Sequence, residues 1–126
     1  MRLLLAVIAA MAMLVPAIGQ EIHHHEGQSE AVDRFYSTWM MPSDPTRSCC
    51  NTIDCYVPEH VEHRPGGWWF ERREDHVMVH VPASHIEQNR DNPDGRNHVC
   101  AAPAESPVAE NGPDHGVYCF IVGAGL

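Results

Sequence analysis

The amino-acid sequence predicts a small α+β domain in which one short N-terminal helix packs on a small antiparallel sheet and disulfides staple the parts together. Three observations predict this class. A helical apolar period occurs once, early in the chain, and several later segments alternate as strands do. Five cysteines are present in only 126 residues. Because so small a chain builds a marginal core, disulfides are an expected source of its stability.

The N-terminus predicts export. Met1 and Arg2 give a positive start, residues 3–14 are continuously apolar, and Ala17 and Gly19 are small residues at cleavage spacing. This pattern is typical of a secretory signal peptide over residues 1–19. The apolar run is too short for a membrane-spanning helix, which needs roughly 20 residues. We therefore expect a periplasmic or secreted protein that does not span a membrane.

The mature chain is expected to begin with a flexible, histidine-containing tail over residues 20–28, followed by a single domain over residues 29–126. Ser29 is a predicted helix N-cap, and acidic residues occupy the first turn after it. Apolar residues recur at helical spacing up to Met40, and Pro42 is expected to close the helix. Residues 42–48 are then expected to form a turn-rich connector.

The middle of the chain predicts a three-stranded antiparallel meander. Residues 56–64 are expected to be extended, Pro65–Gly67 to form a turn, and residues 68–73 to form a strand. After a turn at Glu74–Asp75, residues 76–82 alternate cleanly. This alternation predicts that Val77, Val79 and Val81 face the core, with His76, Met78 and His80 on the opposite face.

The C-terminal third predicts two further strands. A single helical turn is expected within residues 83–91, and "NPDG" at residues 92–95 is a strong turn signal. A brief strand then carries His98 and Cys100, residues 101–116 are expected to form a flexible loop, and a buried strand passes through Cys119.

The cysteines are the candidate disulfide residues: Cys49, Cys50, Cys55, Cys100 and Cys119. A bridge between the neighbours Cys49 and Cys50 would need strained geometry, so at least one of them pairs elsewhere. We expect Cys55 to be joined to Cys100 or Cys119, with one member of the vicinal pair taking the other. The fifth cysteine is then a thiol, or forms a disulfide-linked dimer.

Metal binding is the alternative use of these residues. Cys49, Cys50, Cys55, Cys100 and His98 offer thiolate and imidazole ligands, although the spacing is not that of the common zinc motifs. Two further candidate sets use histidine. The tail residues His23, His24 and His25 are candidates for loose capture of zinc, nickel or copper ions. The strand face of His76, Met78 and His80 combines imidazole with thioether, which suits copper. The solvated face of a strand explains the last three equally well.

Trp68 and Trp69 are candidate partner-binding residues. Neighbouring residues of a strand point to opposite faces, so the two rings cannot enter the same side of the sheet. An exposed tryptophan beside a glycine turn can anchor a protein or stack on a sugar. The alternative is that the core covers one ring and the helix covers the other.

Charge narrows the class of partner. The chain carries 8 Lys plus Arg against 17 Asp plus Glu, for a net charge of −9. All the basic residues are arginine, and loss of Arg2 with the signal peptide would make the net charge −10. Nucleic acid is not expected as a partner, because binding phosphate needs clustered cations. A basic protein or an envelope component fits better.

The ordered pattern "SCCNxxDC", "GGWW", "VxVP", "NPDGxxHVC" and "YCF" resembles a group of small, uncharacterised exported proteins of alphaproteobacteria. The resemblance covers nearly all of the mature chain. It implies export and a shared cysteine framework, and it carries over no catalytic residue.

No sequence motif of a known catalytic class is present, and we expect no cofactor. The sequence therefore predicts a noncatalytic exported domain that binds a protein or an envelope component. The alternative is a periplasmic metal-binding protein that uses its histidines.

Overall fold

The structure is a computed structural model that describes residues 28–50, 55–112 and 114–125. The predicted signal peptide and the segment 20–27 of the predicted tail lie outside these ranges. The elements are α1 (Glu30–Thr38), β1 (Met40–Met41), β2 (Asp44–Ser48), β3 (Cys55–Tyr56), β4 (Val61–Arg64), β5 (Gly67–Glu71), β6 (Met78–His80), the 3₁₀ turn η1 (Ala83–His85), β7 (His98–Ala101), α2 (Pro107–Asn111) and β8 (Val117–Ile121).

Helix α1 starts where the sequence predicts it. The Ser29 side chain accepts a hydrogen bond from the Val32 amide, which satisfies one of the free amides of the first turn. Val32, Phe35 and Tyr36 form the apolar part of the buried face, and Asp33 is also buried. The helix ends at Thr38, earlier than the predicted stop at Pro42. The reason is a competing hairpin: Trp39 is extended, and its carbonyl accepts a 2.8 Å hydrogen bond from the Cys49 amide.

A three-stranded antiparallel sheet of order β3-β7-β8 forms the centre of the molecule. Its two faces enter two different hydrophobic clusters. Cys100 lies on the face that packs against α1, whereas Val99 and Phe120 lie on the face that packs against the meander. All four residues of β7 are buried, as expected for a strand covered on both faces.

The predicted meander is present as a second sheet, of order β4-β5-β6. Its turn at Gly66 and Gly67 has φ angles of +103° and +132°, conformations that favour glycine. Phe70 and Val79 pair across β5 and β6 and pack against the central sheet. The segment predicted to be continuously extended from residue 56 is divided, because Tyr56 belongs to the central sheet and β4 begins at Val61.

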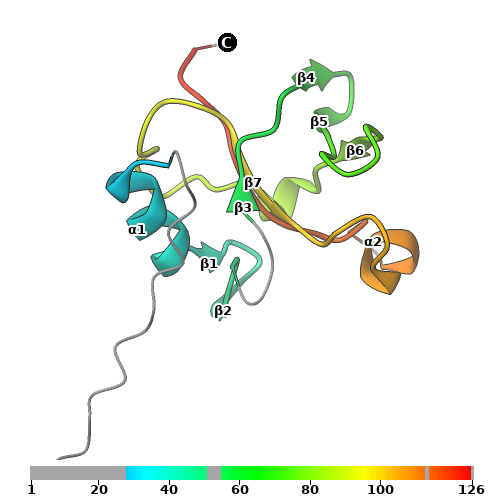
Figure 1. The fold of residues 1–126 in the computed structure, drawn as a ribbon, viewed down its shortest axis with the longest axis horizontal. Coiled ribbons are helices and arrows are strands. Elements are labelled where there is room, and N and C mark those ends of the chain that lie inside the picture. The colour runs from blue at the N-terminus through cyan, green and yellow to red at the C-terminus, as the bar shows by residue number, and fades with distance from the viewer. Residues whose placement is uncertain (1–27, 51–54, 113, 126) are drawn as a thin grey trace, which may run out of the picture.

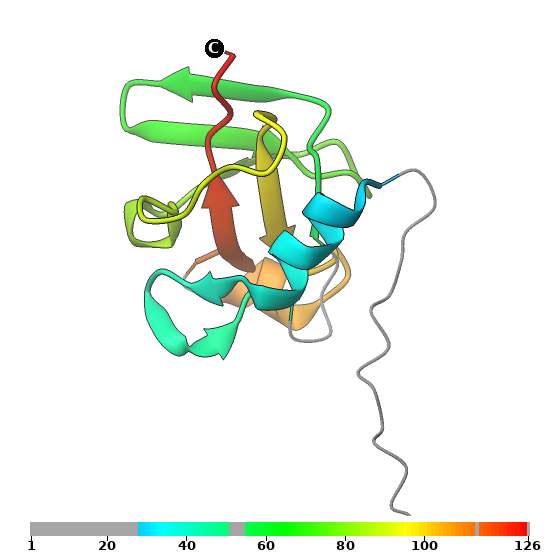
Figure 2. The same cartoon turned by 90° about the vertical axis from the view of Figure 1, so that its left-hand side faces the viewer.

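Figure 1 shows α1 on one side of the central strands β3 and β7, with the meander on the other, and Figure 2 shows the same layers from a perpendicular direction. The α+β class with disulfides is therefore correct. The strands, however, form three small antiparallel sheets rather than one. No helix in the described ranges is both long enough and apolar enough to cross a bilayer.

Two segments predicted to lack regular structure are ordered. The expected connector forms the β1–β2 hairpin, in which Met40 pairs with Ser48. The expected flexible loop contains α2, which Ser106 caps by accepting a hydrogen bond from the Val108 amide. Pro107 at the first helical position fits the N-terminal preference of proline, a signal that the prediction overlooked.

The predicted valine face was wrong at one position. Val79 and Val81 are buried, but Val77 is 48% exposed. The turn before β6 is longer than predicted: the Arg72 amide donates to the Val77 carbonyl, and the His76 amide donates to the Arg72 carbonyl. His76 has a φ of +58°, so the strand alternation starts only at Met78. His76 consequently does not share a strand face with Met78 and His80.

Candidate functional site

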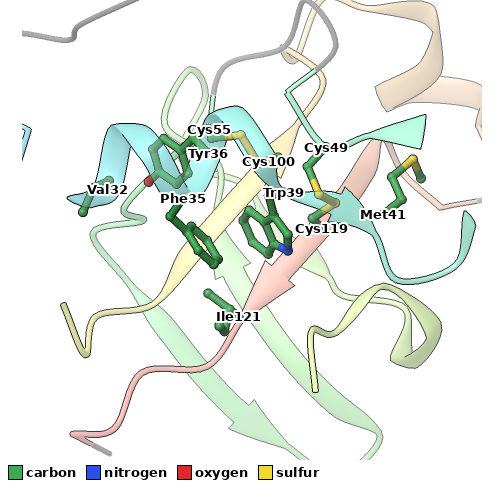
Figure 3. Close-up of a cluster of buried hydrophobic side chains, with 10 residues drawn as sticks. All are labelled: Val32, Phe35, Tyr36, Trp39, Met41, Cys49, Cys55, Cys100, Cys119 and Ile121. Carbon is green, nitrogen blue, oxygen red and sulfur yellow. A yellow bond between two sulfur atoms is a disulfide. The ribbon is translucent and has the colours of Figure 1, made fainter. Parts of the chain in front are cut away.

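The five cysteines converge on the α1 side of the central sheet. Cys55 pairs with Cys100 across β3 and β7, and Cys100 pairs with Cys119 across β7 and β8, so three sulfur-bearing residues form a row across the sheet. The β1–β2 hairpin brings Cys49 and Cys50 to this row, because the Cys49 amide bonds to the Trp39 carbonyl. Figure 3 shows four of these cysteines beside the aromatic residues of α1.

Two disulfides follow the predicted scheme. Cys49 is joined to Cys119, which lies 70 residues further along the chain, and Cys55 is joined to Cys100. The first bond ties the segment after β2 to β8, and the second ties β3 to β7. Cys49, Cys100 and Cys119 are completely buried. The disulfides therefore belong to the core between α1 and the central sheet.

Cys50 lies in direct contact with the second disulfide. Its Sγ is within bonding reach of Cys55 Sγ and 3.7 Å from Cys100 Sγ. Since one sulfur forms a single disulfide at a time, Cys55 pairs with either Cys100 or Cys50, and the remaining sulfur carries a thiol. The sequence predicted a leftover thiol at one of the vicinal cysteines; it did not predict this contact.

The mixed cysteine and histidine metal set is not assembled. Cys49 is in a disulfide, and both ring nitrogens of His98 have other partners: Nδ1 lies 2.7 Å from the Tyr36 hydroxyl and Nε2 lies 2.8 Å from an Asp94 carboxylate oxygen. Within the described ranges, the one group of three or more His, Cys, Asp and Glu residues close enough to share an ion is Cys50, Cys55 and Cys100. The disulfide chemistry of these three residues competes with any such use.

His98 belongs instead to a polar chain that the sequence did not predict, which runs from buried Tyr36 through buried His98 to Asp94 at the surface. Burial lowers the pKa of His98, and the hydrogen bond to Asp94 only partly opposes that effect. Burial raises the pKa of Asp94, but hydrogen bonds from the Arg96 backbone and side chain and from His98 outweigh it and lower the value to about 2. Asp94 is thus ionised and accepts a hydrogen bond from His98 Nε2. His98 Nδ1 is then free of a proton and accepts a hydrogen bond from the Tyr36 hydroxyl. In the sequence, the one indication of this chain is the four-residue spacing of Asp94 and His98 within "NPDGRNH".

The two tryptophans lie on opposite faces of β5, as the strand geometry predicts. The Trp68 ring is 6.4 Å from the Phe120 ring, measured between centroids, and packs against the cluster beneath the meander. Trp69 belongs to neither hydrophobic cluster of the described residues. Its ring lies between the guanidinium of Arg64, 4.9 Å from the centroid, and the ring of His80, 5.1 Å away.

We call the side of the meander that carries Trp69 the outer face. The cross-strand pairs place Glu62 and His80 beside Trp69, and Met78 beside Glu71. None of these side chains is fully buried. The outer face comprises Glu62, Arg64, Trp69, Glu71, Met78 and His80.

Hydrogen bonds hold the carboxylates of the outer face in place. Arg64 contacts Glu62 and thereby lowers the pKa of that carboxyl group. His76 Nδ1 contacts Glu71, and this hydrogen bond raises the pKa of His76. A hollow of about 160 Å³ adjoins Glu71 and His76; it is also lined by Tyr56, Val57, Glu59 and Arg73. The meander thus presents an indole ring together with several acidic groups.

The histidine metal candidates are dispersed or undescribed. His23, His24 and His25 lie outside the described residues. His80 Nε2 lies 3.1 Å from the Gly66 carbonyl oxygen, and His76 contacts Glu71 from the turn. Metal binding by these side chains stays a prediction.

Comparison with known proteins gives no relative on which to base a function: no protein-family model, no curated protein and no solved structure matches the chain.

Proposed function

We propose that the chain is a noncatalytic, exported domain that binds the arginine- or lysine-rich segment of another protein through its outer face. The observation that carries the proposal is the position of Trp69, which points away from both hydrophobic clusters and is flanked by carboxylates. Export is supported by the apolar leader in the sequence and by disulfides between distant segments, which are typical of oxidising compartments.

A contact within the domain indicates the chemistry of the partner. Arg64 is held by the Trp69 ring on one side and by the Glu62 carboxylate on the other. An indole face combined with a carboxylate attracts a cation through its quadrupole and through its charge. Glu71 provides a second carboxylate two residues along the same strand face, beside the hollow that also contains Glu59. A partner's cationic side chain would meet the same combination there.

The overall charge supports the same class of partner. A net charge of −9 favours encounter with a positively charged surface and disfavours encounter with an acidic one. Because exposed charges are screened beyond a Debye length of about 8 Å at physiological ionic strength, binding should weaken as salt is raised. An affinity that does not change with salt concentration would instead attribute binding to the tryptophan alone.

A matched pair of charge variants tests the proposal. The probe is an arginine-rich peptide, with a glutamate-rich peptide of the same length as a negative control, and affinity is measured by calorimetry. Glu71→Gln should weaken binding about 5- to 20-fold, because a charge-assisted contact contributes roughly 1 to 2 kcal/mol. Glu110→Gln on α2 removes the same charge from an exposed site outside the outer face and should leave affinity within about twofold. Equal effects of the two variants would mean that only net charge matters and would reject the outer face as the contact.

A further inference from the structure

We propose that Cys50, Cys55 and Cys100 form a thiol–disulfide exchange site, in which one disulfide moves between the Cys55–Cys100 and Cys50–Cys55 pairings. This site lies on the α1 side of the central sheet, whereas the outer face lies on the meander. The inference therefore stands independently of the proposed binding function.

The arrangement of the three sulfurs carries the inference. All three lie within 4.8 Å of one another, and Cys55 Sγ is the atom in reach of both others. The Cys49–Cys119 disulfide anchors the residue next to Cys50 to β8, so the chain holds Cys50 beside the row rather than leaving it on a free segment. An attacking thiol and its target disulfide are thus brought together by the fold, which lowers the entropic cost of the reaction.

The exchange step needs no external oxidant. The Cys50 thiolate attacks Cys55 Sγ, the Cys55–Cys100 bond breaks, and the bonding electron pair leaves on Cys100 Sγ. Cys100 then takes up the proton that Cys50 released. The number of disulfides and thiols is unchanged, and the reverse step restores the first pairing.

The two pairings differ in which thiol a reagent can reach. With Cys55–Cys100 joined, the thiol is on Cys50, which is half-buried. With Cys50–Cys55 joined, the thiol is on Cys100, which has no exposed surface. Exchange therefore alternates the domain between a form that can react with the thiol or disulfide of another molecule and a form that is protected.

The sequence allows each pairing to be identified by peptide mapping. Cleavage after arginine and before aspartate places the cysteines in four fragments, and only Cys49 and Cys50 stay together. The Arg64–Pro65 bond resists cleavage, so Cys55 lies in fragment 54–72. The Cys55–Cys100 pairing links fragment 54–72 to fragment 97–113. The Cys50–Cys55 pairing links fragment 54–72 to fragment 48–53, which the Cys49–Cys119 bond already joins to fragment 114–126.

Labelling with N-ethylmaleimide then separates exchange from a fixed mixture. Mildly acidic denaturant stops exchange. When the mature protein is labelled under these conditions, some molecules should carry the label on Cys50 and others on Cys100. Labelled in the native state, it should carry label on Cys50 alone and to completion, because exchange keeps returning the thiol to Cys50. Two results would overturn the inference. One is a single labelled position in denaturant. The other is a fraction of the native protein that never takes up label and that equals the fraction labelled on Cys100 in denaturant.

Two variants provide the reference species. Both variants keep the Cys49–Cys119 bond. As their second disulfide, Cys50→Ser should contain Cys55–Cys100 and Cys100→Ser should contain Cys50–Cys55, and neither variant should take up label. Two labelled thiols in Cys100→Ser would show that the second pairing does not form. Three labelled thiols in the wild-type protein, accompanied by bound zinc, would replace the exchange site with a metal site. If a variant does not fold, the wild-type labelling still decides.

Discussion

The Tyr36 hydroxyl donates a 2.7 Å hydrogen bond to His98 Nδ1 and so joins α1 to the middle strand of the central sheet. Both residues are buried. Tyr36→Phe should lower the free energy of unfolding by about 1 to 3 kcal/mol, because it leaves the buried His98 nitrogen without a partner. Tyr118→Phe, at a half-buried ring, is the matched control and should cost less than about 1 kcal/mol. Urea denaturation measures both; equal small effects would contradict a structural role for this bond.

The same polar chain predicts a loss of stability in acid. The pKa of His98 in the folded protein lies below its ordinary value of 6.5, so the unfolded chain binds the proton more tightly and stability falls as the pH drops below about 6.5. The pKa of Asp94, about 2 in the folded protein against 3.8, predicts a further loss as the pH falls from about 4 toward 2.

His76 has the opposite effect to His98. Its pKa is raised in the folded protein, so its contribution to stability is present in acid and is lost as the pH rises. The measurement is therefore best made on His76→Gln, with urea denaturation at a series of pH values. A free energy of unfolding that stays constant from neutral pH down to about 5 would contradict the buried neutral state of His98.

The tryptophans should respond unequally to truncation. Trp68→Ala removes a ring that packs near Phe120 and should cost about 3 kcal/mol of stability. Trp69→Ala should cost less than about 1.5 kcal/mol, since its ring packs in neither cluster, but it should weaken binding of the arginine-rich peptide. Thermal unfolding and calorimetry measure the two properties separately. Similar large destabilisation by both variants would place Trp69 in the core.

The Cys49–Cys119 disulfide should be the principal covalent support of the fold. It closes a loop with a sequence separation of 70, and removing it in Cys49→Ala/Cys119→Ala should cost about 4 kcal/mol. Cys50→Ala leaves both predicted bonds available and should cost less than about 1 kcal/mol. A double variant as stable as the wild-type protein in denaturant would show that noncovalent packing alone holds β8 in place.

Local patterns predicted much of this fold from the sequence. Ser29, the glycine turn at Gly66–Gly67 and the buried strand through Cys119 act through neighbours close in the chain, and each is found where it was expected. The errors arise where longer-range pairing decides. Trp39 leaves the helix because its carbonyl pairs with Cys49, and Val77 leaves the strand because a wider turn uses its carbonyl.

The candidate site was predictable only in part for the same reason. Vicinal geometry limited the pairings of Cys49 and Cys50. The strand register Cys55–Cys100–Cys119 and the β1–β2 hairpin, which no local pattern indicated, bring the cysteines together. The opposite orientation of Trp68 and Trp69 follows from strand geometry alone. The chain from Tyr36 through His98 to Asp94 joins residues up to 62 positions apart, and no local pattern indicates the Tyr36 contact.

The most direct test of the central claim is nuclear magnetic resonance of the ¹⁵N-labelled mature domain titrated with the arginine-rich peptide. The outer-face proposal predicts that the largest shifts occur at the Trp69 indole and at the amides of Glu62, Glu71 and His80, and that they diminish as salt is raised. Shifts concentrated on α2 or on the β1–β2 hairpin, or no localised shifts at physiological salt, would contradict it.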